Sequence, residues 1–460
     1  MAARTSPERL QAAVRLEAQG ETAKAERAYR SVLEAAPREP TALMRLGLLL
    51  SARGAFDKAA PLFRRAALAG PRDVTARMNL AAALLRQGDE DGAIGAYAEA
   101  VAIDPAYRDA RLNLAYRLRF NRRLEEARAH YQALVERDSG DGLARWNLAS
   151  LAGLAGDIDA AFAGFAHPQA MRTADRLLDL PRWRGEPLAG HRIVLDAEQG
   201  LGDAIMFIRL APLLKTAGGY VILRGQKDLR EILGTFPGVD EFVFRDGPAP
   251  DADVWTPLGE LVAMFGAAAS LAAAPGSYLC AEPARRASWG KRLGAADRPR
   301  VGLVWAGGAG HPEDSLRSMP LTVLLDALSG VEGVELMSMQ KGPAAAQAEG
   351  TSLTRIDHAL HDFSDTAALL SHIDLVISVD TSTLHLAGAV GAPVWGLVAF
   401  MPDWRWMLDR TDSPWYPSLR LFRQPRPRDW PAVARAVAEA LRRRVSEGRA
   451  VPRTPTAAGG

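Results

Sequence analysis

Hydrophobic and polar positions divide this chain into two regions with different periods. Up to about residue 165, small and aromatic residues recur at a fixed long interval, in segments with the length of paired helices. Beyond about residue 190, short apolar runs rich in β-branched residues alternate with helix-length segments. We therefore expect an α-helical repeat followed by an α/β region.

The first region repeats every 34 residues, because Pro37, Pro71 and Pro105 share that spacing and Ser139 takes the next slot. Three further sets keep the same period: small residues in the first helix of each unit, alanines in the second helix, and aromatic residues four positions later. They are Ala13, Gly47, Ala81, Ala115 and Ala149; Ala25, Ala59, Ala93 and Ala127; and Tyr29, Phe63, Tyr97 and Tyr131. A small residue permits close helix approach, an aromatic ring fills the gap to the next unit, and proline ends the unit.

This pattern resembles the tetratricopeptide repeat, with four units over residues 6–141 and a fifth over about 142–165. The resemblance implies a surface that docks an extended peptide or another protein. In the alternative interpretation, the repeats only dimerise or brace the neighbouring domain.

The second region contains two series of predicted strands. They lie at 192–197, 220–225, 241–244 and 253–257, and then at 300–307, 334–340, 353–358, 374–380 and 393–398. This alternation predicts parallel sheets with crossover helices, arranged as two Rossmann-like halves that face a cleft. The expected domains are repeats (1–165), a linker (166–190), a first half (191–283), an inter-domain linker (284–299), a second half (300–445) and a disordered tail (446–460).

Composition narrows the classes of partner. The chain has 460 residues and a formal net charge of +2, which gives no overall attraction to nucleic acid or to an anionic membrane. A single cysteine, Cys280, excludes an internal disulfide framework and fits a reducing compartment. The first 20 residues lack the apolar core of a secretory signal, and no apolar run reads as a membrane span. We therefore expect a cytoplasmic protein.

The strand at 374–380 is followed by "TSTLHLAGAVG", which predicts a helix that starts at the carboxyl end of a parallel strand. Ligands bind at that edge, where free N–H groups and the helix dipole attract anions. Thr381 and Ser382 would hold a phosphate in the first turn, Asp380 would cap the turn, and His385 lies one turn further along. In the alternative interpretation, Asp380 is only a cap and His385 is a hydrogen-bonded buried histidine.

A second cluster follows the strand at 192–197 in "EQGLGDAIMFIRLAPLLK". Gly200 and Gly202 permit a tight turn close to a ligand, but the dinucleotide fingerprint is incomplete because its third glycine is missing. Asp203 stands at a helix start that faces the predicted cleft. It is either a general base or simply an N-cap.

A third cluster is the glycine-rich loop at 304–320, which contains Trp305 and ends near Arg317. The fixed charge of Arg317 suits a diphosphate. Gln340 and Lys341 end the next strand at the same edge of the sheet, although Lys341 can also be read as a solvated surface charge.

These clusters resemble a known enzyme family. "GLGDAIMFIRLAPLL" is similar to the N-terminal loop of the bacterial heptosyltransferases, and "VDTSTLHLAGAVGAPVWGL" is similar to their donor-site motif. "EQGLGDA", "WAGGAGHPEDSLRS" and "DWRWMLDRTDSPWYPS" resemble phrases of bacterial glycosyltransferases that carry tetratricopeptide repeats. The order of the two regions is also similar to that of O-linked N-acetylglucosamine transferases and of flagellin glycosyltransferases, in which repeats recruit flagellin and the sugar is a nonulosonic acid such as pseudaminic acid.

The resemblance implies a GT-B fold and assigns a role to each cluster. Asp203 would be the base that acts on an acceptor hydroxyl. The donor-binding set would be Gly202, Trp305, Arg317, Gln340, Lys341, Asp380, Thr381, Ser382 and His385. The family's Gly-Pro-Met is replaced by Ser382, Thr383 and Leu384, which leaves the donor sugar open, and Arg317 replaces a lysine.

The expected activity is protein O-glycosylation by a metal-independent, inverting glycosyltransferase. A nucleotide-sugar is its substrate, no cofactor is expected, and the repeats dock an acceptor protein, with flagellin as the best single candidate. A lipid-linked or surface glycan acceptor, or a non-catalytic adaptor, stays open as an alternative. "PDWRW" and "DSPWYP" would form aromatic and cationic walls of the cleft, or would only pack the two halves together.

Overall fold

The computed structural model describes residues 6–167, 179–308, 310 and 314–447. The chain forms two compact units, residues 1–148 and 149–460, and each is described by itself. Parts of the predicted linker (168–178), of the loop at 304–320 (309 and 311–313) and of the predicted tail (448–460) lie outside the described residues.

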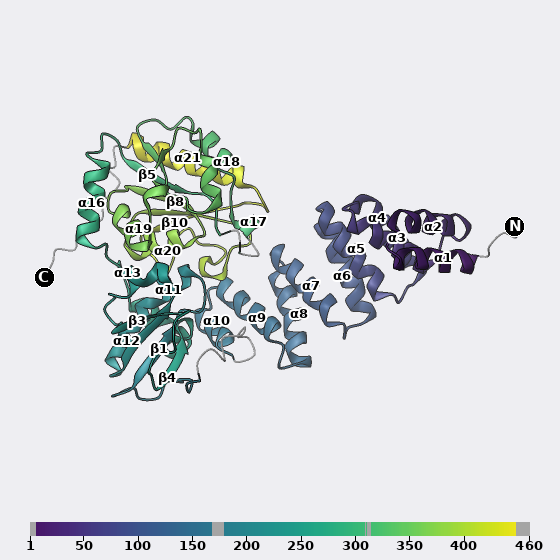
Figure 1. Cartoon of the computed structure of the whole chain (residues 1–460), viewed down its shortest axis with the longest axis horizontal. Helices are drawn as coiled ribbons and strands as arrows, with labels where there is room; N and C mark the ends of the chain where they lie inside the picture. The colour runs from purple at the N-terminus through teal and green to yellow at the C-terminus, as the bar shows by residue number, and fades with distance from the viewer. Residues whose placement is uncertain (1–5, 168–178, 309, 311–313, 448–460) are drawn as a thin grey trace. The chain divides into compact units, whose positions relative to one another are not determined.

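The first unit is a row of antiparallel helix pairs (Figure 1). Its helices are α1 (Ser6–Ala18), α2 (Thr22–Ala35), α3 (Pro40–Ala52), α4 (Phe56–Ala69), α5 (Val74–Gln87), α6 (Glu90–Ile103), α7 (Arg108–Phe120), α8 (Leu124–Arg137) and the start of α9 (Gly142–Leu154). The predicted repeat is confirmed in its physical detail. The four second-helix alanines are fully buried, as are Tyr29 and Tyr131, and Phe63 is 1% exposed.

Gly47 shows why the first helix of a repeat needs a small residue. A Cβ placed on Gly47 would lie 2.6 Å from Cε1 of Phe63, the aromatic residue of the same unit. The small residue therefore permits the close approach of α3 and α4, as predicted, while the Phe63 ring, predicted to fill the gap to the next unit, makes this contact within its own unit. Pro37, Pro71 and Pro105 each lie in a turn between two helix pairs.

The second compact unit begins within α9 and includes α10 (Ile158–Phe165). The helices of the predicted fifth repeat thus pack largely with the α/β region. Phe162 of α10 lies edge-on to Phe207, with ring centroids 5.5 Å apart, and α10 also contacts α14 (Leu261–Phe265). The Asp159 carboxylate accepts a hydrogen bond from the backbone N–H of Ala267 at 2.7 Å.

The first sheet has four parallel strands in the order β3-β2-β1-β4. They are β1 (Arg192–Asp196), β2 (Tyr220–Gly225), β3 (Glu241–Phe244) and β4 (Val254–Pro257). The long helix expected after β1 is divided into α11 (Leu201–Phe207), a 3-10 turn η2 (Ile208–Leu210) and α12 (Ala211–Thr216). Pro212 explains the division, because a proline lacks the N–H that a continuous helix would require.

The second sheet has six parallel strands in the order β7-β6-β5-β8-β9-β10, the Rossmann order. They are β5 (Arg300–Val304), β6 (Glu335–Ser338), β7 (Thr354–Arg355), β8 (Leu375–Val379), β9 (Val394–Val398) and β10 (Leu419–Arg423). All nine predicted strands are confirmed. The sequence reading missed the edge strand β10, whose five residues follow a long irregular segment.

Further helices cover the two sheets. They are η3 (Lys227–Leu229), α13 (Arg230–Leu233), η4 (Leu258–Glu260), α15 (Ala267–Ala272), α16 (Pro283–Leu293), α17 (Asp314–Arg317), α18 (Leu321–Leu328), η5 (Pro343–Ala348), η6 (Asp357–Ala359), α19 (Phe363–Leu370), α20 (Ser382–Ala389), η7 (Trp404–Trp406) and α21 (Trp430–Ser446). The expected inter-domain linker contains most of α16. Arg285 of α16 pairs with Asp362 and Asp365 beside α19.

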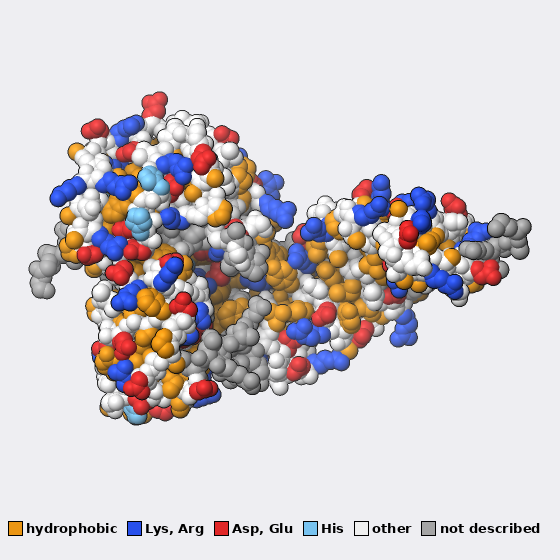
Figure 2. All heavy atoms as spheres, viewed as in Figure 1, with side chains coloured by type: hydrophobic (Ala, Val, Ile, Leu, Met, Phe, Trp, Pro, Cys, Tyr) orange, Lys and Arg blue, Asp and Glu red, His pale blue; other side chains and the backbone are white. Residues whose placement is uncertain are grey.

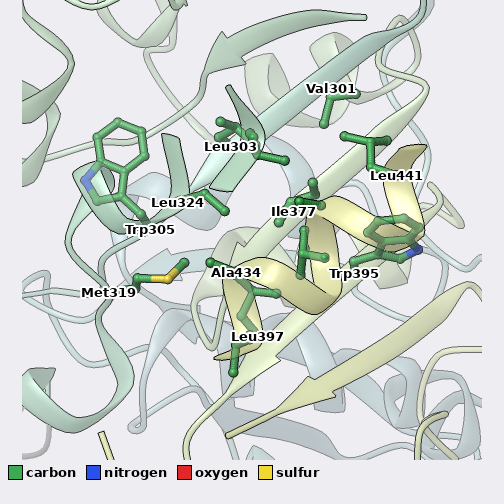
Figure 3. Packing of buried hydrophobic residues seen from close by; sticks show 14 of the residues in the cluster. Val301, Leu303, Trp305, Met319, Leu324, Ile377, Trp395, Leu397, Ala434 and Leu441 are labelled. Carbon is green, nitrogen blue, oxygen red and sulfur yellow. The ribbon is translucent and has the colours of Figure 1, made fainter. Parts of the chain in front are cut away.

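The core of the second half lies between β5, β8 and β9 and the helices α18 and α21 (Figure 3). Val301, Leu303, Ile377 and Leu397 are fully buried there. This packed layer holds the carboxyl ends of the strands in place.

Positive and negative side chains are interspersed over the visible face (Figure 2), in agreement with the small net charge. No helix among the described residues is long and apolar enough to cross a bilayer.

Candidate functional site

A cavity of about 570 Å³ in the second unit collects nearly all of the predicted site residues. It is lined by the β1–α11 turn, the loop after β5, the loop after β6, the start of α20, and the segment around η7. The predicted residues on its wall are Gly202, Asp203, Arg317, Gln340, Lys341, Asp380, Thr381, Ser382 and His385. Groups from both sheets therefore share one cavity, as their positions at strand ends predict.

The amino end of α20 is open toward the cavity. Thr381, and not Asp380, is the N-cap residue, and its side chain makes no capping hydrogen bond to the first turn. The Thr381 hydroxyl instead lies 3.1 Å from the Ser378 hydroxyl. The prediction that Asp380 caps this turn is therefore wrong. The N–H groups of the first turn remain available to an anion.

Asp380 itself lines the cavity, where burial raises the pKa of its carboxyl to about 6. Asp403 acts in the same direction through its negative charge. The carboxyl is thus adjusted to accept or release a proton near neutral pH.

His385 is buried, and its ring packs against two aromatic side chains. Its Nδ1 lies 2.9 Å from the Tyr416 hydroxyl, and its ring centroid is 5.2 Å from that of Trp406. Burial lowers the pKa of His385 to about 3, and the positive charge of Arg405 acts in the same direction. Above that pH the imidazole is neutral, so it offers the cavity a hydrogen-bonding group and not a positive charge.

Gly202 brings α11 into direct contact with α20. A Cβ at Gly202 would stand 2.7 Å from Cδ2 of His385, so the two helices can approach this closely only with glycine there. We expect Gly202→Ala to destabilise the fold by about 1–3 kcal/mol through overpacking. Urea unfolding measures this loss. Gly308→Ala is the matched control, because Gly308 lines the same cavity and its Cβ would meet no atom of the described residues within 4 Å. Equal unfolding midpoints for the two variants would contradict the contact.

Asp203 occupies the third position of α11, and both of its carboxylate oxygens are engaged. Oδ2 accepts a hydrogen bond from the Gly200 N–H at 3.1 Å, and Oδ1 is bound by Arg405. Burial raises the pKa of the Asp203 carboxyl, and the Arg405 guanidinium opposes that shift. Gly200 is the N-cap of α11, so the interpretation of Asp203 as an N-cap is wrong; Asp203 is the N3 residue, whose carboxylate accepts the N-cap N–H and also lines the cavity.

Arg317 and Lys341 place two cations on the cavity wall. The guanidinium Nε of Arg317 lies 3.3 Å from Asp314. The ammonium of Lys341 donates to the backbone carbonyls of Asp357 and Leu360, which leaves one of its three donors for a ligand. Lys341 is exposed, in agreement with the surface-charge interpretation, but these two hydrogen bonds anchor its ammonium on the cavity wall.

Gln340 holds the loop after β5. Its Oε1 accepts hydrogen bonds from the N–H groups of Trp305 and Ala306, and its Nε2 donates to the carbonyls of Ala306 and Lys341. The amide therefore shapes the cavity wall and has no donor left over for a ligand.

Trp305 does not line the cavity. Its side chain is fully buried within the core of the second half, where Figure 3 shows it beside Met319. The strand run that ends at Trp305 continues the buried pattern of β5, which is why its ring points into the core.

Sequence reasoning left Arg405 and Asp403 out of the candidate set, although both line the cavity. Arg405 binds Asp203 and also donates to Asp403 at 2.8 Å. The phrase "PDWRW" does suggest a cationic wall, but only the folded chain shows which acidic group this arginine contacts.

Comparison with known proteins now bears on this site. Residues 10–71 and 50–108 match the tetratricopeptide repeat model, and residues 359–428 match the glycosyltransferase family 9 (heptosyltransferase) model. The chain combines tetratricopeptide repeats with a heptosyltransferase-family segment. That segment contains α20 with Thr381, Ser382 and His385, and also Arg405.

One curated relative is Protein FlbA of Caulobacter vibrioides, which is 30% identical over 294 residues. The alignment covers 57% of this chain and 48% of FlbA, so the chain spans about half the length of that relative.

Solved structures similar to this chain include two repeat proteins. The crystal structure of MamA is 22% identical, with a TM-score of 0.31, and the match covers 33% of this chain and 90% of MamA. YrrB, described as a tetratricopeptide repeat protein with an unusual peptide-binding site, is 21% identical, with a TM-score of 0.32 and coverages of 34% and 81%.

Proposed function

We propose that this chain transfers a sugar from a nucleotide-sugar to a serine or threonine hydroxyl of a protein docked by its repeats, with flagellin as the best candidate acceptor. One observation carries the proposal: a carboxylate of the first half, Asp203, shares a cavity with the anion-binding groups of the second half. Two parallel sheets that contribute to one site support the GT-B arrangement. The heptosyltransferase-family match supports sugar transfer as the reaction class.

In the proposed reaction, Asp203 accepts the proton of the acceptor hydroxyl. The hydroxyl oxygen forms a bond to the anomeric carbon, while the bond from that carbon to the phosphate oxygen breaks. The phosphate leaves with the bonding electrons, and an attack opposite the leaving group inverts the anomeric centre. The sugar is thereby joined to the acceptor, and the nucleotide is released with its phosphate charge.

Groups of the protein stabilise the leaving phosphate in this proposal. They are the Arg317 guanidinium, the remaining donor of Lys341, and the N–H groups at the start of α20 with the hydroxyls of Thr381 and Ser382. Neutral His385 can add a hydrogen bond. The nucleotide-sugar is a substrate, so no resident cofactor takes part.

Stabilisation by these groups predicts that transfer is independent of a divalent cation. We expect a chelator such as EDTA to change the rate by less than about twofold, because fixed charges and dipoles of the protein take the place of a bound ion.

Arg317→Gln should lower the affinity for inorganic pyrophosphate by about tenfold or more, since a charge-assisted hydrogen bond is lost. Calorimetry with pyrophosphate and a transfer assay with and without EDTA check both expectations. A chelated enzyme that regains its rate only with a metal ion would contradict the first.

The acceptor is tested by mass. Intact flagellin purified from cells with and without this protein should differ by the mass of one or more sugars. The full chain, incubated with unmodified flagellin and a nucleotide-activated nonulosonic acid, should restore the missing mass. If flagellin has the same mass in both strains while a surface glycan changes, the acceptor is a glycan. An unchanged mass of every protein and glycan, together with no pyrophosphate binding, would favour the adaptor.

A further inference from the structure

Arg405 joins the proposed base to the proposed donor site. We infer that Arg405 exchanges Asp203 for a phosphate group of the donor, so that the base becomes available only once the donor is in place. Arg405 is a positioning residue in this scheme, because it acts on the acceptor hydroxyl through Asp203. The inference rests on the proposed function and adds an order of binding to it.

Both carboxylate oxygens of Asp203 accept a hydrogen bond, and the contact with Arg405 is also an ion pair, whose positive charge lowers the pKa of Asp203 and so makes it a weaker base. Its Oδ2 receives the Gly200 N–H, and its Oδ1 receives the Arg405 guanidinium. A general base needs a lone pair directed at the proton that it removes. The Gly200 bond belongs to the backbone turn that starts α11, so Arg405 is the partner that can leave.

Arg405 also lies on the wall of the proposed phosphate site. It lines the same cavity as Arg317 and the start of α20. Its side chain is 12% exposed, and its Nε is buried without a hydrogen-bond partner among the described residues. A side chain with a spare donor at the edge of an anion site can turn to a ligand without breaking all of its existing contacts.

Two further contacts keep Arg405 close to both Asp203 and the proposed phosphate site during the exchange. Asp403 accepts from Nη1 at 2.8 Å, and the guanidinium carbon lies 4.4 Å from the centroid of the Trp404 ring. Neither partner has to be given up when Nη2 leaves Asp203. The movement required is therefore local.

The charges around Arg405 favour the exchange only when a phosphate ligand is present. Burial raises the pKa of Asp203, and the negative charge of Asp403 acts in the same direction. Glu198 also interacts electrostatically with Asp203. His385, across the contact between α11 and α20, is neutral. A pyrophosphate brings more negative charge than the single Asp203 carboxylate. A doubly charged anion in a low-dielectric cavity attracts the guanidinium more strongly, so the exchange is favourable only with the donor bound.

A double-mutant cycle tests the exchange with inorganic pyrophosphate as the probe and calorimetry as the readout. In the full chain, Arg405→Gln should weaken pyrophosphate binding by about tenfold or more. Asp203→Asn should strengthen it by about threefold or more, because Arg405 no longer has to be withdrawn from a carboxylate. In the Arg405→Gln background, that gain should disappear.

Control variants make the result specific. Arg410→Gln should bind pyrophosphate as the wild type does, since Arg410 pairs with Asp412 and does not line the cavity. Arg405→Lys keeps a cation and should recover most of the lost affinity. It also serves as the second variant if Arg405→Gln fails to give a folded protein by circular dichroism.

Two results would overturn the inference. If Arg405→Gln binds pyrophosphate as tightly as the wild type while Arg317→Gln binds weakly, the donor site stands and the exchange does not. If Asp203→Asn strengthens binding equally in both backgrounds, its effect is a general loss of negative charge and not a release of Arg405. A wild-type protein that does not bind pyrophosphate at all would instead contradict the proposed function itself.

Discussion

Asp203→Asn is expected to lower sugar transfer by about 10²- to 10⁴-fold, the contribution typical of a general base. Asparagine has nearly the same shape, and its side-chain oxygen can still accept the Gly200 hydrogen bond that starts α11. The variant should therefore fold and bind pyrophosphate, but it cannot take the proton of an acceptor hydroxyl. Transfer measured by intact mass of the acceptor, alongside calorimetry with pyrophosphate, checks both parts.

Asp412→Asn is the matched control, because Asp412 also pairs with an arginine but lies outside the cavity. It should leave transfer unchanged. A transfer rate for Asp203→Asn within about threefold of the wild type, far from the loss typical of a missing base, would show that another group removes the proton. Asp380 would then be the next candidate, since it lines the same cavity and burial raises the pKa of its carboxyl to about 6.

The pH dependence follows from the same groups. The base must be ionised, so transfer should fall as the pH drops through the pKa of Asp203, which burial raises above that of an ordinary aspartate. His385, with its pKa lowered to about 3, is neutral throughout the neutral range and should add no limb there.

Removal of α10 is expected to have the second large effect. A chain that begins at Gly142 keeps α9 and α10 and should stay folded and bind pyrophosphate, although it lacks the preceding repeats and should no longer modify a protein acceptor. A chain that begins at residue 166 should be insoluble or unable to bind pyrophosphate. Thermal unfolding and calorimetry of the two truncated chains measure the difference.

The physical reason is the aromatic contact beneath Arg405. In α10, the Phe162 ring centroid lies 5.1 Å from that of Trp404, and the Phe165 centroid lies 5.3 Å from it. Without α10, Trp404 and Phe207 would be exposed as an apolar patch beside the site. Phe162→Ala should cost about 3–5 kcal/mol of stability in the full chain.

Phe120→Ala offers the matched control, since Phe120 is a partly buried aromatic residue of the first unit whose ring packs at a tilt against Tyr116. It should leave pyrophosphate binding unchanged. If the chain beginning at residue 166 binds pyrophosphate as well as the chain beginning at Gly142 does, α10 is not needed to hold the site.

Much of the fold could be predicted because its signals are local. The 34-residue spacing identifies the positions where helices approach closely, such as Gly47, although it did not predict that Phe63 of the same unit fills that contact. The nine strands could be found because a buried parallel strand is a short continuous apolar run. β10 was missed because two arginines interrupt the apolar residues of "LRLFR" at the edge of the sheet and no helix directly precedes it among the described residues.

The candidate site was predictable to the extent that strand ends of parallel sheets converge on one edge. That rule places Asp203, Arg317 and His385 in one cavity, as found. It does not predict the orientation of each side chain. Trp305 points into the core, and the side-chain amide of Gln340 hydrogen-bonds to the backbone of the loop.

The sequence by itself therefore determined the repeats, the two parallel sheets and the strand ends at which the polar groups gather, because each depends on periods and spacings of near neighbours. Only the tertiary structure decided that Arg405 binds Asp203, 202 positions away in the chain, and that α10 packs under Trp404. Both contacts join segments that no period relates. Their partners are selected by packing and charge once the sheets are in place.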